Sequence, residues 1–266
     1  MLDIKGLHTT LERSSGEYNL LAQLDFGCAL WINRHFIAIA YVAFIGGALM
    51  GIVNNGSFHH MVSELNGDAM SALTLLSKSE SSFKALDEGI LFARIAAQNV
   101  QASIYTFMLG ISFGIGSLIM LIINGAVVGC MLLMLLNSSP SYVAIASVAA
   151  HAPVELAGLL MCGAAGLRLG WGLVRAITSS SIWHLHVATI EALSLAFASV
   201  AMLLVSSAIE TFVSFSPNIA PACKLAVGVV AILMMLICIY MSRLHWMHHR
   251  GKQHAARCDG IETSAN

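Results

Sequence analysis

Six stretches of the chain are almost wholly apolar, and shorter polar segments separate them. A bilayer core of roughly 30 Å is crossed by about 20 helical residues at ~1.5 Å per residue. We therefore expect an all-α, polytopic bundle of about six transmembrane helices. The expected spans are Phe36–Val53, Asn99–Phe113, Ser117–Leu136, Tyr142–Gly166, His186–Ile209 and Lys224–Tyr240.

These spans divide the chain into three parts: a polar N-terminal segment (1–35), the transmembrane domain (36–240) and a basic, His-rich tail (241–266). A long polar segment, 54–98, interrupts the domain after its first span. Its second half repeats apolar residues at helical spacing, which predicts an amphipathic helix near 81–99. Two interpretations stay open for this helix: a connector that lies on the membrane surface, or a docking surface for an external partner.

Lys and Arg are distributed unevenly between the two ends of the expected spans. With the N-terminus in the cytoplasm, nine of these residues fall on the cytoplasmic side and four on the outer side. Because cytoplasmic loops are enriched in Lys and Arg, both termini are expected to be cytoplasmic. The basic tail would lie close to anionic lipid headgroups.

Composition agrees with a membrane protein and excludes several other classes. Hydrophobic residues make up 58% of the chain, charged residues only 10%, and the mean hydropathy is +0.80. A net charge of −1 without a basic stripe speaks against nucleic-acid binding. The six cysteines contain no CxxC pair and are interpreted as small packing residues, and no cofactor is expected.

The fourth span carries the most unusual polar residues, His151 and Glu155. Four residues are about one helical turn, so both side chains leave the same helix face. Gly158 and Gly166 share that face, while Leu156 and Leu160 point the opposite way. Since small faces pack against other helices in a membrane, His151 and Glu155 are expected to point into the bundle.

Pro153 lies between this histidine and glutamate and removes the helical partner of the Ala149 carbonyl. The simpler interpretation is a tolerated kink. The alternative is a free carbonyl that helps to bind a cation or to order a water molecule.

Three further polar residues lie in apolar surroundings. Glu210 ends the fifth span, and Asn124 lies inside the third, so we expect both to join His151 and Glu155 in an intramembrane polar cluster. His151 is expected to be the nearer partner of Glu210, because a direct Glu155–Glu210 contact requires a tilted or kinked helix. Glu191, near the cytoplasmic end of the fifth span, is interpreted as a solvated interfacial residue rather than a partner of Arg168 or Arg175.

Several chemical roles are open to this cluster. It is interpreted either as a buried hydrogen-bonded pair that sets helix register, or as a proton or ion relay. A metal site requires three protein ligands to converge, which the sequence alone leaves undecided. The chain has no HExxH motif and no nucleophile elbow, so no catalytic residue is assigned.

Glycines recur at spacings that let helix backbones approach closely in lipid. The expected helix-packing residues are Gly125, Gly129, Pro153, Gly158, Gly166 and Gly170.

Several motifs occur in order between Asn99 and Pro217 and together resemble the stage II sporulation protein M family. NGAVVG (Asn124–Gly129) comes first, followed by HAPVELAGLLMCGAAGLRLGW (His151–Trp171) and then AIETFVSFSP (Ala208–Pro217). The second resembles the family's HG-x-x-E motif, and the third its IE-x-F-x-SP motif.

The resemblance implies an inner-membrane scaffold that holds peptidoglycan hydrolases, as the sporulation proteins D and P are held during engulfment. The partners expected from it are the lipid bilayer and other membrane or envelope proteins, and self-association stays open. Two alternatives rest on the polar cluster instead: a permease-like transport subunit, or an intramembrane metal-dependent hydrolase.

Overall fold

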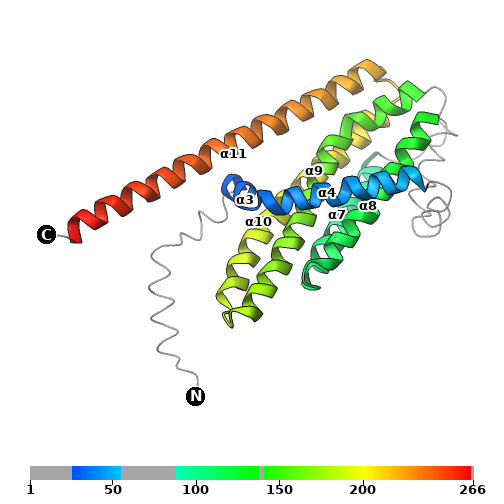
Figure 1. Cartoon of the computed structure of the whole chain (residues 1–266). Helices are drawn as coiled ribbons and strands as arrows, with labels where there is room; N and C mark the ends of the chain where they lie inside the picture. The colour runs from blue at the N-terminus through cyan, green and yellow to red at the C-terminus, as the bar shows by residue number, and fades with distance from the viewer. Residues whose placement is uncertain (1–25, 55–87, 138–140, 265–266) are drawn as a thin grey trace.

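The computed structural model of the chain describes residues 26–54, 88–137 and 141–264, with side chains described up to residue 248. All regular structure in these ranges is helical, which confirms the expected all-α bundle (Figure 1). The expectations for residues 1–25 and 55–87 lie outside the described residues. The elements are α3 (Phe26–Ile32), α4 (Arg34–Val53), α7 (Glu88–Met108), η2 (Leu109–Ile111), α8 (Ile115–Asn137), α9 (Ser141–Thr178), α10 (Trp183–Ile209), η3 (Glu210–Ser214) and α11 (Pro221–Ser264).

Five of these helices are long and apolar enough to cross a membrane. They cover Arg34–Val53, Ile115–Asn137, Tyr142–Thr178, Trp183–Ser214 and Pro221–His248. The expected span Asn99–Phe113 is not among them. Its residues form the second half of α7, then η2 and the start of the following turn. The first half of α7 is the described part of the expected amphipathic connector. These two expected elements are therefore one helix that packs in the bundle, where Phe92 stacks on Phe212 with ring centroids 6.4 Å apart.

Helix α9 is the central element and contacts α4, α7, α8, α10 and α11. Because neighbours surround it, its bulky face is also covered. Leu160 is buried with Ala40 and Phe44 of α4, and Leu156 packs against the same group. The expectation that this face of α9 is turned away from the bundle is wrong, since α4 and α8 lie against it.

Helices α4 and α8 run side by side in the same direction. Gly47 lies against the backbone of Ile122, and one turn later Gly51 lies against Ala126. On the α8 side, Gly125 lies against Phe44 of α4. The residue numbers rise together on both helices, so the pair is parallel, and the absence of side chains at the glycines is what allows this close approach.

A tight reversal between α7 and α8 allows α8 to run parallel to α4. After the 3₁₀ turn η2, Phe113 and Gly114 both take positive φ values, 57° and 84°. Glycine takes such values at little cost. Helix α7 thus returns the chain along the bundle before α8 starts, and Gly114 packs on Leu167 of α9.

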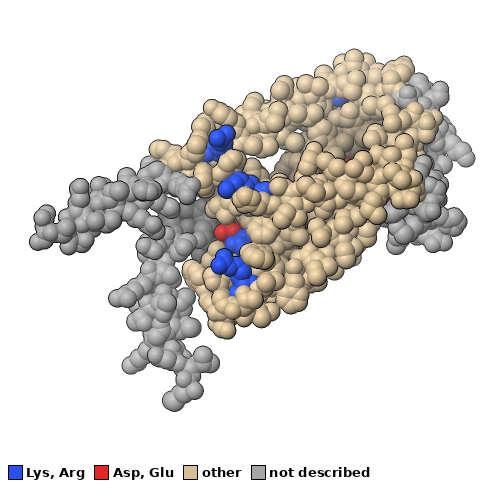
Figure 2. All heavy atoms as spheres, in the orientation of Figure 1, with Lys and Arg blue, Asp and Glu red and all other residues tan. Residues whose placement is uncertain are grey.

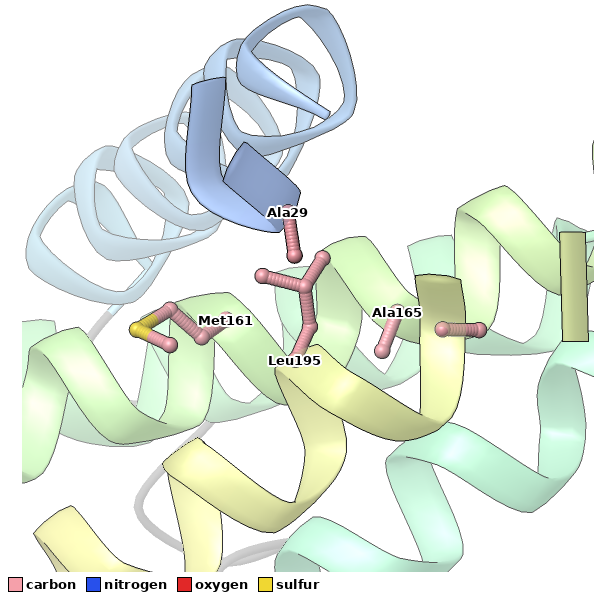
Figure 3. Packing of buried hydrophobic residues seen from close by; sticks show 5 residues of the cluster. Ala29, Met161, Ala165 and Leu195 are labelled. Carbon is pink, nitrogen blue, oxygen red and sulfur yellow. The ribbon is translucent and has the colours of Figure 1, made fainter. Parts of the chain in front are cut away.

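Helix α3 lies between α11 and the α9–α10 pair (Figure 1). Its Ala29 packs into a core cluster with Met161 and Ala165 of α9 and Leu195 of α10 (Figure 3). On its other side, the rings of Trp31 and Trp246 lie 5.8 Å apart. The start of the described chain and this part of α11 therefore lie at one end of the bundle, and α11 continues as a helix to Ser264, well past the expected end at Tyr240.

Candidate functional site

Three of the four residues expected in the polar cluster converge. His151 and Glu155 belong to α9, and Glu210 is the first residue of η3. One potential ligand atom from each lies within 4.8 Å of the other two. The cluster therefore contains one imidazole and two carboxyl groups, between α9 and the end of α10.

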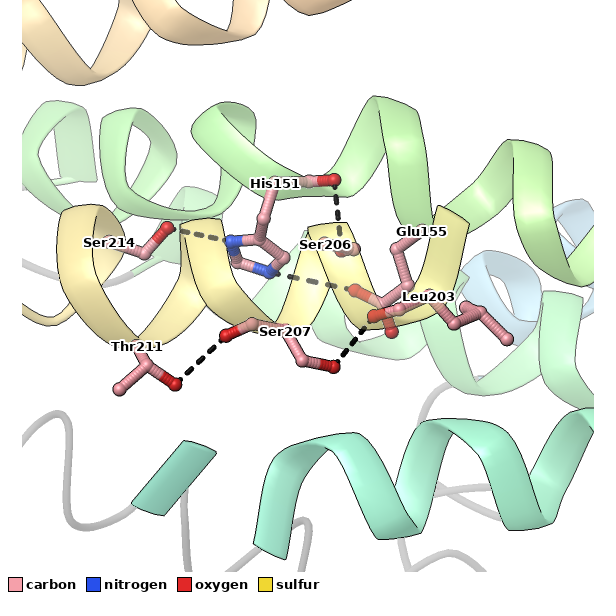
Figure 4. A network of polar contacts seen from close by, with 7 residues as sticks. All are labelled: His151, Glu155, Leu203, Ser206, Ser207, Thr211 and Ser214. Carbon is pink, nitrogen blue, oxygen red and sulfur yellow. Dashed lines mark hydrogen bonds and ion pairs between the residues drawn. The ribbon is translucent and has the colours of Figure 1, made fainter. Parts of the chain in front are cut away.

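The ring of His151 is fixed from two sides (Figure 4). Its Nδ1 is hydrogen-bonded to the hydroxyl of Ser214 at 2.8 Å, and its Nε2 lies 3.7 Å from a carboxylate oxygen of Glu155. The hydroxyl of Ser206 donates to the carbonyl of His151 at 3.3 Å. With only 8% of the residue exposed, His151 has little freedom to turn.

A local change of helix geometry brings Glu210 and Ser214 to the site. Residues Glu210–Ser214 form a π-helix, in which the amide of Phe215 donates to the carbonyl of Glu210. This wider turn continues α10 and lets both side chains face α9. Single π turns in α-helices occur frequently at functional sites.

Pro153 lies inside α9 without ending it. The carbonyl oxygen of Ala149, which Pro153 leaves without a helical donor, lies against Gly228 of α11. The backbone of α11 therefore fills the space beside this carbonyl.

Lys224, the first residue of the sixth expected span, is buried beside the cluster. Only 6% of the residue is exposed. Its ammonium group donates to the Ser214 carbonyl at 2.7 Å and to the Ser147 hydroxyl at 3.2 Å. The signal in the sequence was a lone lysine at the edge of an apolar span, which is more often an interfacial residue.

A small polar cavity of about 90 Å³ adjoins Glu155. The Glu155 side chain keeps 33% of its surface accessible. The amide nitrogen of Asn99 and the hydroxyl of Ser103 are buried without a hydrogen-bonding partner among the described residues. The lining residues are Asn99, Ala102, Ser103, Asn124, Glu155, Leu159 and Leu203.

Asn124 is therefore placed at the cavity, not in the His151–Glu155–Glu210 group. Its amide nitrogen donates to the carbonyl of Met120 in its own helix at 2.8 Å. Asn124 and Glu155 are related through this cavity, which both residues line.

The expected packing glycines of α9 lie against α10, α8 and the turn between α7 and α8. At Gly158, an added Cβ would meet Leu203 of α10, and the hydroxyl of Ser199 donates to the Gly158 carbonyl at 2.6 Å. Gly166 faces the hydroxyl of Ser117 in α8, and Gly170 lies against the backbone of the turn at Gly114. Gly129 of α8 lies against Ala48 of α4.

A second polar contact joins α9 to α10 away from the cluster. Arg168 Nε lies 2.7 Å from a carboxylate oxygen of Glu191, and Glu191 is only 7% exposed. The interpretation of Glu191 as a solvated residue is wrong, because α9 continues past Gly166 and carries Arg168 alongside α10.

Comparison with known protein families identifies a relationship over most of the described bundle. The sequence model of a family described as Stage II sporulation protein M matches residues 36–215. The match begins within α4 and continues through η3, so it includes His151, Glu155 and Glu210. Neither the curated proteins nor the solved structures compared with the chain give a match.

Proposed function

Because this membrane protein belongs to the stage II sporulation protein M family, we propose that it is a multi-pass scaffold of the cytoplasmic membrane. In this role it organises a cell-envelope complex that remodels peptidoglycan, without catalysing a reaction itself. The family match over residues 36–215 is the observation that carries the proposal.

The distribution of charge supports a cytoplasmic location for the end of the bundle where α4 begins. Arg34 and Arg243 both lie over the ring of Trp31, and Arg168 lies over Phe36. On the face shown in Figure 2, Lys and Arg atoms gather mainly at this end. Cytoplasmic ends of membrane helices carry an excess of these residues, and interfacial Trp residues are typical of the headgroup level.

An apolar groove between α4 and α8 supports the proposal that a partner binds within the membrane. The groove has a volume of about 420 Å³. We propose that it receives a transmembrane segment of an envelope protein, since apolar grooves accept apolar helices. The lining residues are Ala38, Ile39, Val42, Ala43, Leu118 and Ile122.

Photocrosslinking from the groove tests the scaffold. A crosslinking amino acid at Val42, 70% exposed, should capture a peptidoglycan hydrolase or its membrane anchor in native membranes. The matched control is Phe197 on α10, 71% exposed and outside the groove, which should capture none. Products are identified by mass spectrometry. Capture from both positions alike, or only of a second copy of the chain from Val42, contradicts the proposal.

A second candidate function, ion or proton transport, is favoured by the convergence of His151, Glu155 and Glu210 beside a polar cavity. Intramembrane carboxylates and histidines form relays in transporters. In reconstituted liposomes, Glu155→Gln should then lower the flux of protons or cations, while Glu88→Gln, a change at an exposed residue, should not. Equal flux from wild type and Glu155→Gln rules out this candidate.

A further inference from the structure

The two carboxyl groups of the cluster, Glu155 and Glu210, lie close together and share one neighbouring imidazole, that of His151. Glu155 and Glu210 belong to a group whose ligand atoms are all within 4.8 Å. In the described part of the chain, neither forms an ion pair with Lys or Arg, and Lys224 is directed to serine oxygens instead. Two carboxylates at this separation repel each other strongly in surroundings of low dielectric constant. A cation of charge +2 between them would neutralise both.

The donor atoms suit a first-row transition metal. Zn²⁺ binds imidazole nitrogen and carboxylate oxygen, and many zinc sites have three protein ligands and one open position. We propose that His151 Nε2, Glu155 and Glu210 bind one Zn²⁺ ion between α9 and the end of α10.

The environment of His151 matches that of a metal ligand. Its Nδ1 is hydrogen-bonded to the Ser214 hydroxyl at 2.8 Å, which leaves Nε2 directed to the carboxyl groups. Lys224 in turn holds the carbonyl of Ser214 at 2.7 Å. A hydrogen bond on the second ring nitrogen orients histidine ligands in metal sites and makes them more basic. Ser214 and Lys224 are thus positioning residues.

The cavity beside Glu155 supplies the open side of this site. Its volume of about 90 Å³ has room for about three water molecules. Asn99 Nδ2 and Ser103 Oγ, two of the buried polar atoms that have no hydrogen-bonding partner among the described residues, belong to its lining and would donate hydrogen bonds there. A water or a small anionic ligand on the metal would therefore meet polar neighbours on the far wall.

Metal analysis of the full-length protein tests the site. The background variant replaces four tail histidines with asparagine, so that the tail contributes no bound metal: His245, His248, His249 and His254. After incubation with Zn²⁺ and dialysis, this protein should retain about one equivalent of zinc. Glu155→Gln and Glu210→Gln should lose it, and Glu88→Gln should retain it. Ser214→Ala should weaken binding by about 10–100-fold.

Cobalt gives a readout that a merely structural role would not change. Co²⁺ in place of Zn²⁺ should show the visible absorption of a four-coordinate ion, and Glu210→Gln should abolish it. Folded background protein that retains no zinc overturns the proposal, whatever the variants do. Equal zinc affinity in Glu155→Gln, Glu210→Gln and the background protein also overturns it. The result of the zinc experiments is independent of the proposed scaffold role. That role is tested separately by the capture of partners from Val42.

Discussion

Gly47→Leu should prevent α4 from packing on α8 and so abolish stable folding. A Cβ atom at Gly47 would overlap the backbone of Ile122, whose Cα would lie only 2.9 Å away. The contact is with backbone, which unlike a flexible side chain cannot move aside. Overpacking of this kind costs about 1–3 kcal/mol or more. Separation of the two helices would also break the contact between Gly51 and Ala126. The yield of monodisperse protein in mild detergent and its thermal stability measure the effect.

The adjacent glycine provides the control. Nothing lies within 4 Å of a Cβ atom added at Gly46. Gly46→Leu should therefore fold, and Gly46→Ala should gain about 0.5–1 kcal/mol, because glycine is unfavourable inside a helix. Gly47→Ala should have the opposite sign. If the leucine variants at 46 and 47 behave alike, the α4–α8 contact is not as close as described.

Arg168→Met should destabilise the protein by about 3–5 kcal/mol, the usual cost of removing one partner of a buried ion pair. The two side chains are only 16% and 9% exposed, so Glu191 would keep a buried charge without its partner. Methionine preserves most of the length of the arginine side chain. Unfolding in detergent with increasing denaturant measures the change in free energy.

A double-mutant cycle separates the effect of charge from that of packing. Arg168→Met combined with Glu191→Met should recover much of the stability, because apolar replacement of both partners is often close to neutral. A double variant as unstable as Arg168→Met alone would show that the loss comes from packing, for example from the contact with Phe36.

Apolar length predicted most of the helices, but not where α7, α9 and α11 begin and end. The fourth span was expected to end at Gly166, two residues before Arg168, yet α9 continues to Thr178. Charged residues mark the edge of an apolar span, whereas backbone hydrogen bonds decide the end of a helix. Likewise, the second span was expected to begin at Asn99, but this residue lies inside α7 and lines a cavity that α8, α9 and α10 also line.

The site was predictable where it depended on one helix. The four-residue spacing of His151 and Glu155 placed both side chains on one turn, and the structure has them 3.7 Å apart. The approach of Glu210 depends on the π-helix and on the packing of α10 against α9, neither of which has a periodic signal in the sequence. For the same reason, the sequence contained no indication that Lys224 contacts Ser214.

The parallel contact of α4 with α8 also has a consequence for the order of events during synthesis. The glycine face of α4 is complete once Val53 has been added, but its partner helix is finished only about 80 residues later. At ~5–20 residues per second, that interval is on the order of ten seconds. Through this time the nascent α4 must wait in the bilayer with Gly47 and Gly51 facing lipid or the insertion machinery.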